Sequence, residues 1–280
     1  MKIIEPKVEL LSELNISPES HIARCSRTCY GKEYKEPNQE ADEKMVDGLI
    51  KRGHLSMLRH SSAYFVFTNH LPEEFKSEYV NTLSQEDYIY ASTNGQFTLE
   101  HNNKADLNSH VFLNLCRKYP ELFELYRMTF CITTQISTSR ELNRKSPNAI
   151  AERSTRYCSS KDGLLICRPW WLSSAKEAAF NSHSPINELW YYNNAISKVE
   201  EAYLTLLGQG MKPEDARGIL PLDTATKVIY TYSIREWQHI LDLRLYDKTG
   251  IAHPNVHVVM QMVKDQINEF AKEHNIDYQV

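Results

Sequence analysis

The spacing of hydrophobic positions predicts several helices along this chain. Residues 188–209 carry apolar side chains at alternating intervals of three and four, a pattern typical of a long helix with one buried face. A helix over 41–53 is expected to end at Gly53, because glycine readily adopts the backbone conformation that closes a helix. The chain pattern predicts further helices over 136–145, from Trp237 to Arg244, and over 255–273.

Other segments have the composition of β-strands. The N-terminal segment 1–11 alternates apolar and charged residues, which predicts a strand with one buried face. Runs rich in β-branched and aromatic residues predict three more strands, over 62–68, 126–134 and 226–234. Strands and long helices therefore occur together along the whole chain.

Residues 69–108 are more polar than their neighbours, with one strand-like piece at 87–92. We interpret the wider segment 69–120 as an insertion. No repeat, low-complexity tract or Gly/Ser linker divides the chain, which favours one domain over 1–280. The expected fold is of the α/β (α+β) class, with a mixed sheet packed against long helices.

Composition narrows the kind of partner. The net charge is −4 over 280 residues, which argues against a protein that coats nucleic acid. No window approaches the ~18 apolar residues of a membrane span, and the N-terminus does not resemble a signal peptide, so a cytoplasmic protein is expected. The six cysteines form no CxxC pair and are expected to be reduced thiols.

The segment 139–157 holds four arginines, two carboxylates and several hydroxyls, with little apolar material. Within it, Ser154, Arg156 and Tyr157 place a hydroxyl, a planar guanidinium and an aromatic ring close together. Those groups suit a phosphate beside a base. The alternative interpretation is a solvated helix end whose ion pairs contribute ~0–1 kcal/mol and carry no function.

Further polar candidates lie before and after this segment. Arg217 precedes an apolar turn, and Arg235 and His239 share a helix face because they are four residues apart. Any of them could equally be paired on the surface. His54 and His60 flank a turn before a strand, but they lack metal-ligand spacing on a helix and an accompanying carboxylate cluster, so no metal site is expected.

The chain resembles the flavin-dependent thymidylate synthase family in the order of four short motifs. They are Gly-His-x-Ser at 53–56, Arg…Ser-x-Arg-Tyr at 144–157, Ala-Arg-x-x-Leu-Pro at 216–221 and Leu-Arg at 243–244. The resemblance covers roughly residues 20–265. It implies reductive methylation of dUMP to dTMP with FAD as cofactor and methylenetetrahydrofolate and NADPH as co-substrates. It also implies a homotetramer whose protomers share active sites.

The resemblance also implies roles for individual residues. Arg144 and Arg244 would be the catalytic residues, and Arg217 would reach the nucleotide from another subunit. The implied dUMP-binding residues are Glu141, Arg144, Glu152, Ser154, Arg156, Arg217 and Arg244. The implied FAD-binding residues are His54, Ser56, Lys145, Arg235, His239 and His253.

The chain departs from the family pattern where flavin contacts are expected. The family signature is Arg-His-Arg, seven residues and then Ser, whereas this chain has Arg144-Lys145-Ser146 before Ser154. Arg59 also stands where the family usually has a glutamate. Two alternatives to thymidylate synthesis therefore stay open, namely a paralogue that modifies another pyrimidine nucleotide and a nucleotide-binding protein that has lost flavin chemistry.

Overall fold

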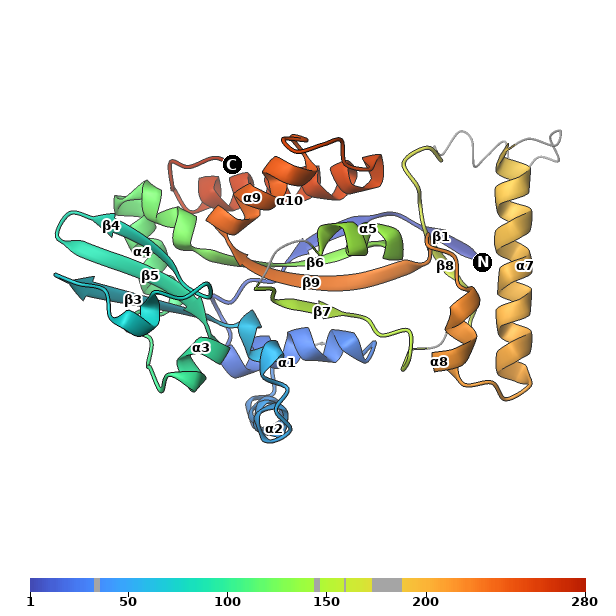
Figure 1. Ribbon diagram of the computed structural model, residues 1–280, viewed down its shortest axis with the longest axis horizontal. Helices are drawn as coiled ribbons and strands as arrows, with labels where there is room; N and C mark the ends of the chain where they lie inside the picture. Colours follow the sequence, from blue (N-terminus) through green and yellow to red (C-terminus); the bar gives the residue numbers. More distant parts are fainter. Residues whose placement is uncertain (33–35, 144–146, 159, 173–187) are drawn as a thin grey trace.

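A four-stranded antiparallel sheet lies at the centre of the molecule (Figure 1). The computed structural model describes residues 1–32, 36–143, 147–158, 160–172 and 188–280. The strand order of the central sheet is β2 (Lys7–Leu10), β6 (Arg127–Gln135), β9 (Ala225–Ser233) and β7 (Ile150–Glu152). The longest pairing joins β6 to β9 over nine residues each, from Arg127 opposite Ser233 to Gln135 opposite Ala225.

Helices cover both faces of this sheet (Figure 1). One face carries α5 (Ile136–Leu142), α9 (Ile234–Arg244) and α10 (Pro254–Glu273), and the other carries α1 (Pro18–Cys29) with α2 (Gln39–Lys51) outside it. Successive side chains of a strand point to opposite faces. Tyr230 of β9 therefore packs in the core under α9, whereas Ile229 packs with Cys25 of α1.

A second antiparallel sheet, in the order β3-β5-β4, lies beside the first. It consists of β3 (Ser62–Thr68), β4 (Asn81–Gln85) and β5 (Tyr88–Asn94), and it is flanked by η1 (Leu55–His60), η2 (Glu73–Phe75), α3 (Gly95–Glu100), α4 (Ser109–Lys118) and η3 (Pro120–Leu125). Phe112 of α4 is fully buried in the same core as the central sheet and stacks on Tyr64, with ring centroids 4.2 Å apart. The segment 69–120 thus contributes both strands and core residues.

The remaining elements gather at the other end of the molecule. β1 (Lys2–Ile4) pairs in parallel with β8 (Leu165–Cys167). Next to them stand the long helix α7 (Glu188–Gly208), the short α8 (Pro213–Ala216) and η4 (Arg217–Ile219) (Figure 1). Leu189, Ile196 and Tyr203 are the buried residues of α7, each seven positions after the last, so this helix buries a single narrow stripe.

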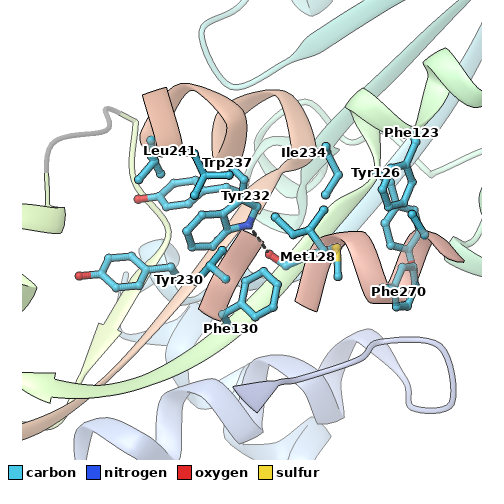
Figure 2. Close-up of a cluster of buried hydrophobic side chains, with 14 of the residues drawn as sticks. Phe123, Tyr126, Met128, Phe130, Tyr230, Tyr232, Ile234, Trp237, Leu241 and Phe270 are labelled. Atoms are coloured by element: carbon cyan, nitrogen blue, oxygen red, sulfur yellow. Dashed lines mark hydrogen bonds between the residues drawn. The ribbon is translucent and has the colours of Figure 1, made fainter. Parts of the chain in front are cut away.

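Aromatic side chains fill the core between the central sheet and α9 (Figure 2). Trp237 is 1% exposed, and its ring packs edge-on against Phe130 at a centroid distance of 5.2 Å. Its indole nitrogen donates to the Met128 carbonyl oxygen at 3.1 Å, so the one polar atom of this side chain is satisfied. Ser233 and Glu236 form a capping box that fixes the start of α9 directly after β9.

The mixed helix-and-sheet class expected from the sequence is confirmed. The structure differs in detail at the N-terminus, where the single strand predicted over 1–11 is divided at Pro6 into β1 and β2, which join different sheets. Within the described residues, the short η helices and α1, α3, α4, α8, β4, β7 and β8 are additional to the predicted elements. None of the described helices is both long and apolar enough to span a membrane.

Candidate functional site

The segment that follows β7 crosses the C-terminal end of α1. The Ser154 backbone N–H donates to the Cys29 carbonyl oxygen at 3.0 Å. Gly31 has φ +62°, and a Cβ atom there would lie 2.7 Å from the Cys158 Sγ atom. Only glycine combines that backbone conformation with so close an approach, so Gly31 allows residues 153–158 to dock on α1.

Arginine side chains from two distant segments meet beside Thr155. The Arg217 Nη1 atom donates to the Thr155 hydroxyl at 3.1 Å, and the Arg156 Nη2 atom donates to the Glu214 carboxylate at 3.2 Å. Arg217 also donates through Nε to the Glu214 carbonyl oxygen at 3.1 Å. We call Thr155, Arg156, Glu214 and Arg217 the arginine cluster. The family resemblance implies that Arg156 and Arg217 bind the same nucleotide, with Arg217 reaching it from another subunit. In this structure the two side chains already meet within one chain, where both donate hydrogen bonds to Glu214.

A hydroxyl-lined cavity of about 150 Å³ adjoins the arginine cluster. Five of its lining residues are serines or threonines, namely Ser154, Thr155, Ser160, Thr224 and Thr226. The Arg156 side chain is 51% exposed, and its ion pair with Glu214 is therefore open to solvent. Such a pair contributes little to stability, and a phosphate can displace the carboxylate at small cost.

Glu152 anchors the end of β7 to its neighbours. Its Oε1 atom accepts hydrogen bonds from the Ser139 hydroxyl of α5 at 2.8 Å and from the Thr226 hydroxyl of β9 at 3.0 Å. Glu152, which leads into the segment that carries Thr155 and Arg156, is therefore held by both α5 and β9.

A second polar cluster lies where α5, α9 and α10 meet, and it contains Glu141, Arg244 and His253. The Arg244 Nη1 atom is 3.8 Å from the Glu141 Oε1 atom, which also accepts the His253 backbone N–H at 3.2 Å. The Arg244 Nε atom is buried and has no hydrogen-bond partner in the described part of the chain. A buried donor without a partner costs ~1–3 kcal/mol, which a ligand oxygen in this position would recover.

The residues expected to hold a flavin fall into separate groups. His54 and Ser56 are exposed at η1, which packs with α1 and α2. Arg235 and His239 lie on α9, on the opposite face of the central sheet (Figure 1). Arg235 donates through Nε to Glu124 at 3.0 Å, whereas His239 is exposed. His253 belongs to the cluster with Arg244, and Arg144 and Lys145 lie outside the described residues.

Arg59 has partners that its sequence position does not reveal. Its Nε atom donates to the Gln96 side chain at 2.6 Å and its Nη1 atom to the Asn148 carbonyl oxygen at 2.9 Å. The guanidinium also lies 5.2 Å from the centroid of the Tyr79 ring. Arg59 therefore joins η1 to α3 and to the segment that precedes β7.

A buried chain of polar side chains crosses the α1 face of the sheet, and sequence reasoning missed it. His21 Nε2 is 3.0 Å from the Thr129 hydroxyl, which is 2.8 Å from the Thr231 hydroxyl, which in turn is 2.9 Å from His60 Nδ1. The Glu13 carboxylate is 3.2 Å from His21 Nε2. Burial lowers the pKa of His60 to about 3 and raises the pKa of Glu13 to about 7. His60 is therefore neutral at neutral pH, and Glu13 keeps its proton until the pH approaches 7.

Comparison with known proteins gives a family match. A family model described as thymidylate synthase complementing protein matches residues 78–271. A flavin-dependent thymidylate synthase of Synechocystis sp. is 26% identical over 161 residues, which cover 55% of this chain and 74% of that protein. One from Haloarcula marismortui is 31% identical over 138 residues, 44% of this chain and 56% of that protein.

Another relative matches a shorter segment, and a solved structure has a lower sequence identity. A flavin-dependent thymidylate synthase of Halobacterium salinarum is 40% identical over 53 residues, 19% of this chain and 22% of that protein. The solved structure of a UMP/dUMP methylase from Streptomyces cacaoi, bound with 5-Br dUMP, is 16% identical, with a TM-score of 0.46 over 97% of this chain and 93% of that one. Because the family model matches more than half of the 280 residues, this chain belongs to the thymidylate synthase complementing protein family.

Proposed function

We propose that this chain is a flavin-dependent methyltransferase that converts dUMP to dTMP, with methylenetetrahydrofolate as the carbon donor and NADPH as the reductant. The observation that carries the proposal is the hydrogen bond from Arg217 to Thr155, the residue before Arg156. Thr155 and Arg217 are 62 residues apart in the sequence. Family membership and the flavin-dependent thymidylate synthases among its relatives support it.

The nucleotide phosphate would lie against the arginine cluster. Ser154 and Arg156 would bind it from the segment after β7, and Arg217 would bind it from η4. Two guanidinium groups make charge-assisted hydrogen bonds with a phosphate, and such bonds are about twice as strong as those between neutral groups. Glu214 competes for Arg156 in the absence of the ligand, so binding includes the loss of that ion pair.

The uracil ring would lie near Arg244. Its Nε atom, which has no partner among the described residues, can donate to a ring carbonyl oxygen, and the guanidinium charge would polarise that carbonyl during methyl transfer. Glu141 contacts Arg244, and Ser139, two residues earlier on α5, contacts Glu152. This helix therefore links the Arg244 cluster to the strand that leads into the arginine cluster, as a nucleotide spanning both would require.

A flavin would supply the redox chemistry when bound, and this chain offers it polar side chains on two elements. His54 and Ser56 are exposed at η1, and His239 is exposed on α9. Because η1 and α9 lie on opposite faces of the central sheet, one flavin would touch both groups only across two protomers (Figure 1). The FAD assignment and the homotetramer are therefore one linked proposal.

The decisive experiment is release of tritium from C5-labelled dUMP in the presence of FAD, NADPH and methylenetetrahydrofolate. We expect release by the wild type and strong loss with Arg244→Ala, whereas the exposed Arg117→Ala on α4 serves as a matched control with full activity. Flavin absorbance without tritium release would instead favour another pyrimidine nucleotide. Nucleotide binding without any flavin uptake would favour a protein that has lost catalysis.

A further inference from the structure

A cavity of about 330 Å³ is lined by residues of α1 and of the turn after it, together with residues of the central sheet. This volume is within the range of small-molecule sites. Its lining includes the buried Cys131 and Ile229. It also includes four basic residues, Arg24, Lys32, Arg153 and Lys227. None of these four residues has a role in the proposed methyl transfer.

The charge around this cavity is unbalanced. Glu9 is the one carboxylate among the lining residues, and Lys7 already binds it at 2.7 Å. No ion pair within the described part of the chain involves Lys32, Arg153 or Lys227. Four cations thus surround one cavity, and among the described residues no carboxylate is paired with Lys32, Arg153 or Lys227.

Neighbouring groups add little negative charge. Burial raises the pKa of the Cys131 thiol to about 11, so the thiol stays neutral. The last carbonyl groups of α1 would repel an anion, but they are occupied: the Arg27, Thr28 and Cys29 carbonyl oxygens accept backbone N–H groups from Tyr30, Gly31, Lys32 and Ser154.

We propose that this cavity binds a small polyanion, a ligand that carries an oligophosphate or an oligocarboxylate group. Several cations around a partly enclosed space raise the local concentration of such a ligand and bind more than one of its charges. The Arg24 guanidinium is held in place by the Ser12 carbonyl oxygen at 2.9 Å and by the His21 ring. Lys227 is exposed and can move to meet the ligand.

The polyanion would lie next to the nucleotide and not in its place. Arg153 lines both this cavity and the hydroxyl-lined cavity beside the arginine cluster. Its backbone is fixed by a hydrogen bond from its N–H to the Lys227 carbonyl oxygen at 2.8 Å. The two cavities are therefore neighbours on either side of one residue, an arrangement that suits a second substrate. The charge argument itself does not depend on which reaction the chain performs.

Isothermal titration calorimetry tests this site with two probes, inorganic pyrophosphate and γ-linked triglutamate, each at low and at physiological salt. We expect at least one probe to bind with one site per chain. Lys227→Ala and Arg153→Ala should each weaken it by about tenfold, and Lys227→Arg should keep wild-type affinity because it keeps the charge. Lys272→Ala, an exposed lysine on α10 across the sheet, is the matched control and should change nothing. The probe that binds identifies the ligand chemistry.

Three results would overturn the proposal. The first is that neither probe binds the wild type at millimolar concentration. The second is that Lys272→Ala weakens probe binding as much as Lys227→Ala does. The third is that dUMP displaces the probe one for one. Equal melting temperatures of the variants show that any loss of binding is not a loss of fold. Tritium release from dUMP is measured on the same preparations, so failure of the polyanion site and failure of the proposed reaction are told apart.

Discussion

Replacing Glu13 with glutamine should change how the stability of the fold depends on pH. The Glu13 side chain is 13% exposed and lies 3.2 Å from the His21 ring. Burial raises its pKa from an ordinary value of 4.5 to about 7. The folded state therefore retains a proton that the unfolded state releases. Stability from this group is complete below pH 4.5 and is lost as the pH rises towards 7.

The size of the effect follows from the shift. Each pKa unit corresponds to ~1.36 kcal/mol, so Glu13 should remove about 3 kcal/mol of stability between acid pH and pH 8. Glutamine resembles the protonated carboxyl in shape and cannot ionise. Glu13→Gln should therefore become more stable relative to the wild type by about 2–3 kcal/mol between pH 5 and pH 8, which urea unfolding at the two pH values measures.

His60 does not disturb this comparison. Its pKa is lowered to about 3, so its contribution is present above pH 6.5 and is lost as the pH falls, in the wild type and in the variant alike. Glu74→Gln, at an exposed position, is the control and should run parallel to the wild type. If Glu13→Gln also runs parallel, within about 0.5 kcal/mol, then Glu13 ionises freely in the folded state and the reasoning fails.

Three further predictions concern binding and packing. Arg156→Ala should weaken dUMP binding by only about 1–2 kcal/mol in calorimetry, because this guanidinium is half exposed. Glu214→Gln should strengthen dUMP binding, because the Glu214 carboxylate competes with the phosphate for Arg156. An unchanged dUMP affinity in Arg156→Ala would reject the phosphate assignment. Gly31→Ala should lower stability by about 1–3 kcal/mol in urea unfolding, and adding Cys158→Ala should recover part of the loss; no recovery would show that the contact with sulfur is unimportant. Trp237→Ala should remove about 3–5 kcal/mol in the same assay, and a loss below 1 kcal/mol would contradict its role in the core.

The parts of the fold that the sequence predicts best are the long periodic ones. The helices α7 and α10 and the strands β3, β6 and β9 lie within about two residues of their predicted bounds. Their periodicity persists over enough residues to be distinguished from chance. β7 has three residues, too few to show alternation, and α1 was missed although Ser17 and Pro18 are a typical N-cap and first residue of a helix.

The sequence identifies only part of the candidate site, because some of its contacts form only in the tertiary fold. The likeness of short motifs identified Arg156, Arg217 and Arg244 as candidates, and their roles stay predictions. The burial of the Arg244 Nε atom without a partner in the described segments, and the buried link between Thr129 and Thr231, both depend on the tertiary fold. Thr129 and Thr231 are 102 residues apart, and nothing local to either one indicates the other.

The pairing of β6 with β9 also has a consequence for how the chain acquires its structure. β6 ends at Gln135 and β9 begins at Ala225, so the longest ladder of the central sheet joins segments separated by most of the second half of the chain. Contacts of such high sequence separation slow folding, because the intervening loop must close before the pairing stabilises it. During synthesis β6 has an open edge until β9 leaves the ribosome, and in that interval the nascent chain is most exposed to pairing with the wrong strand.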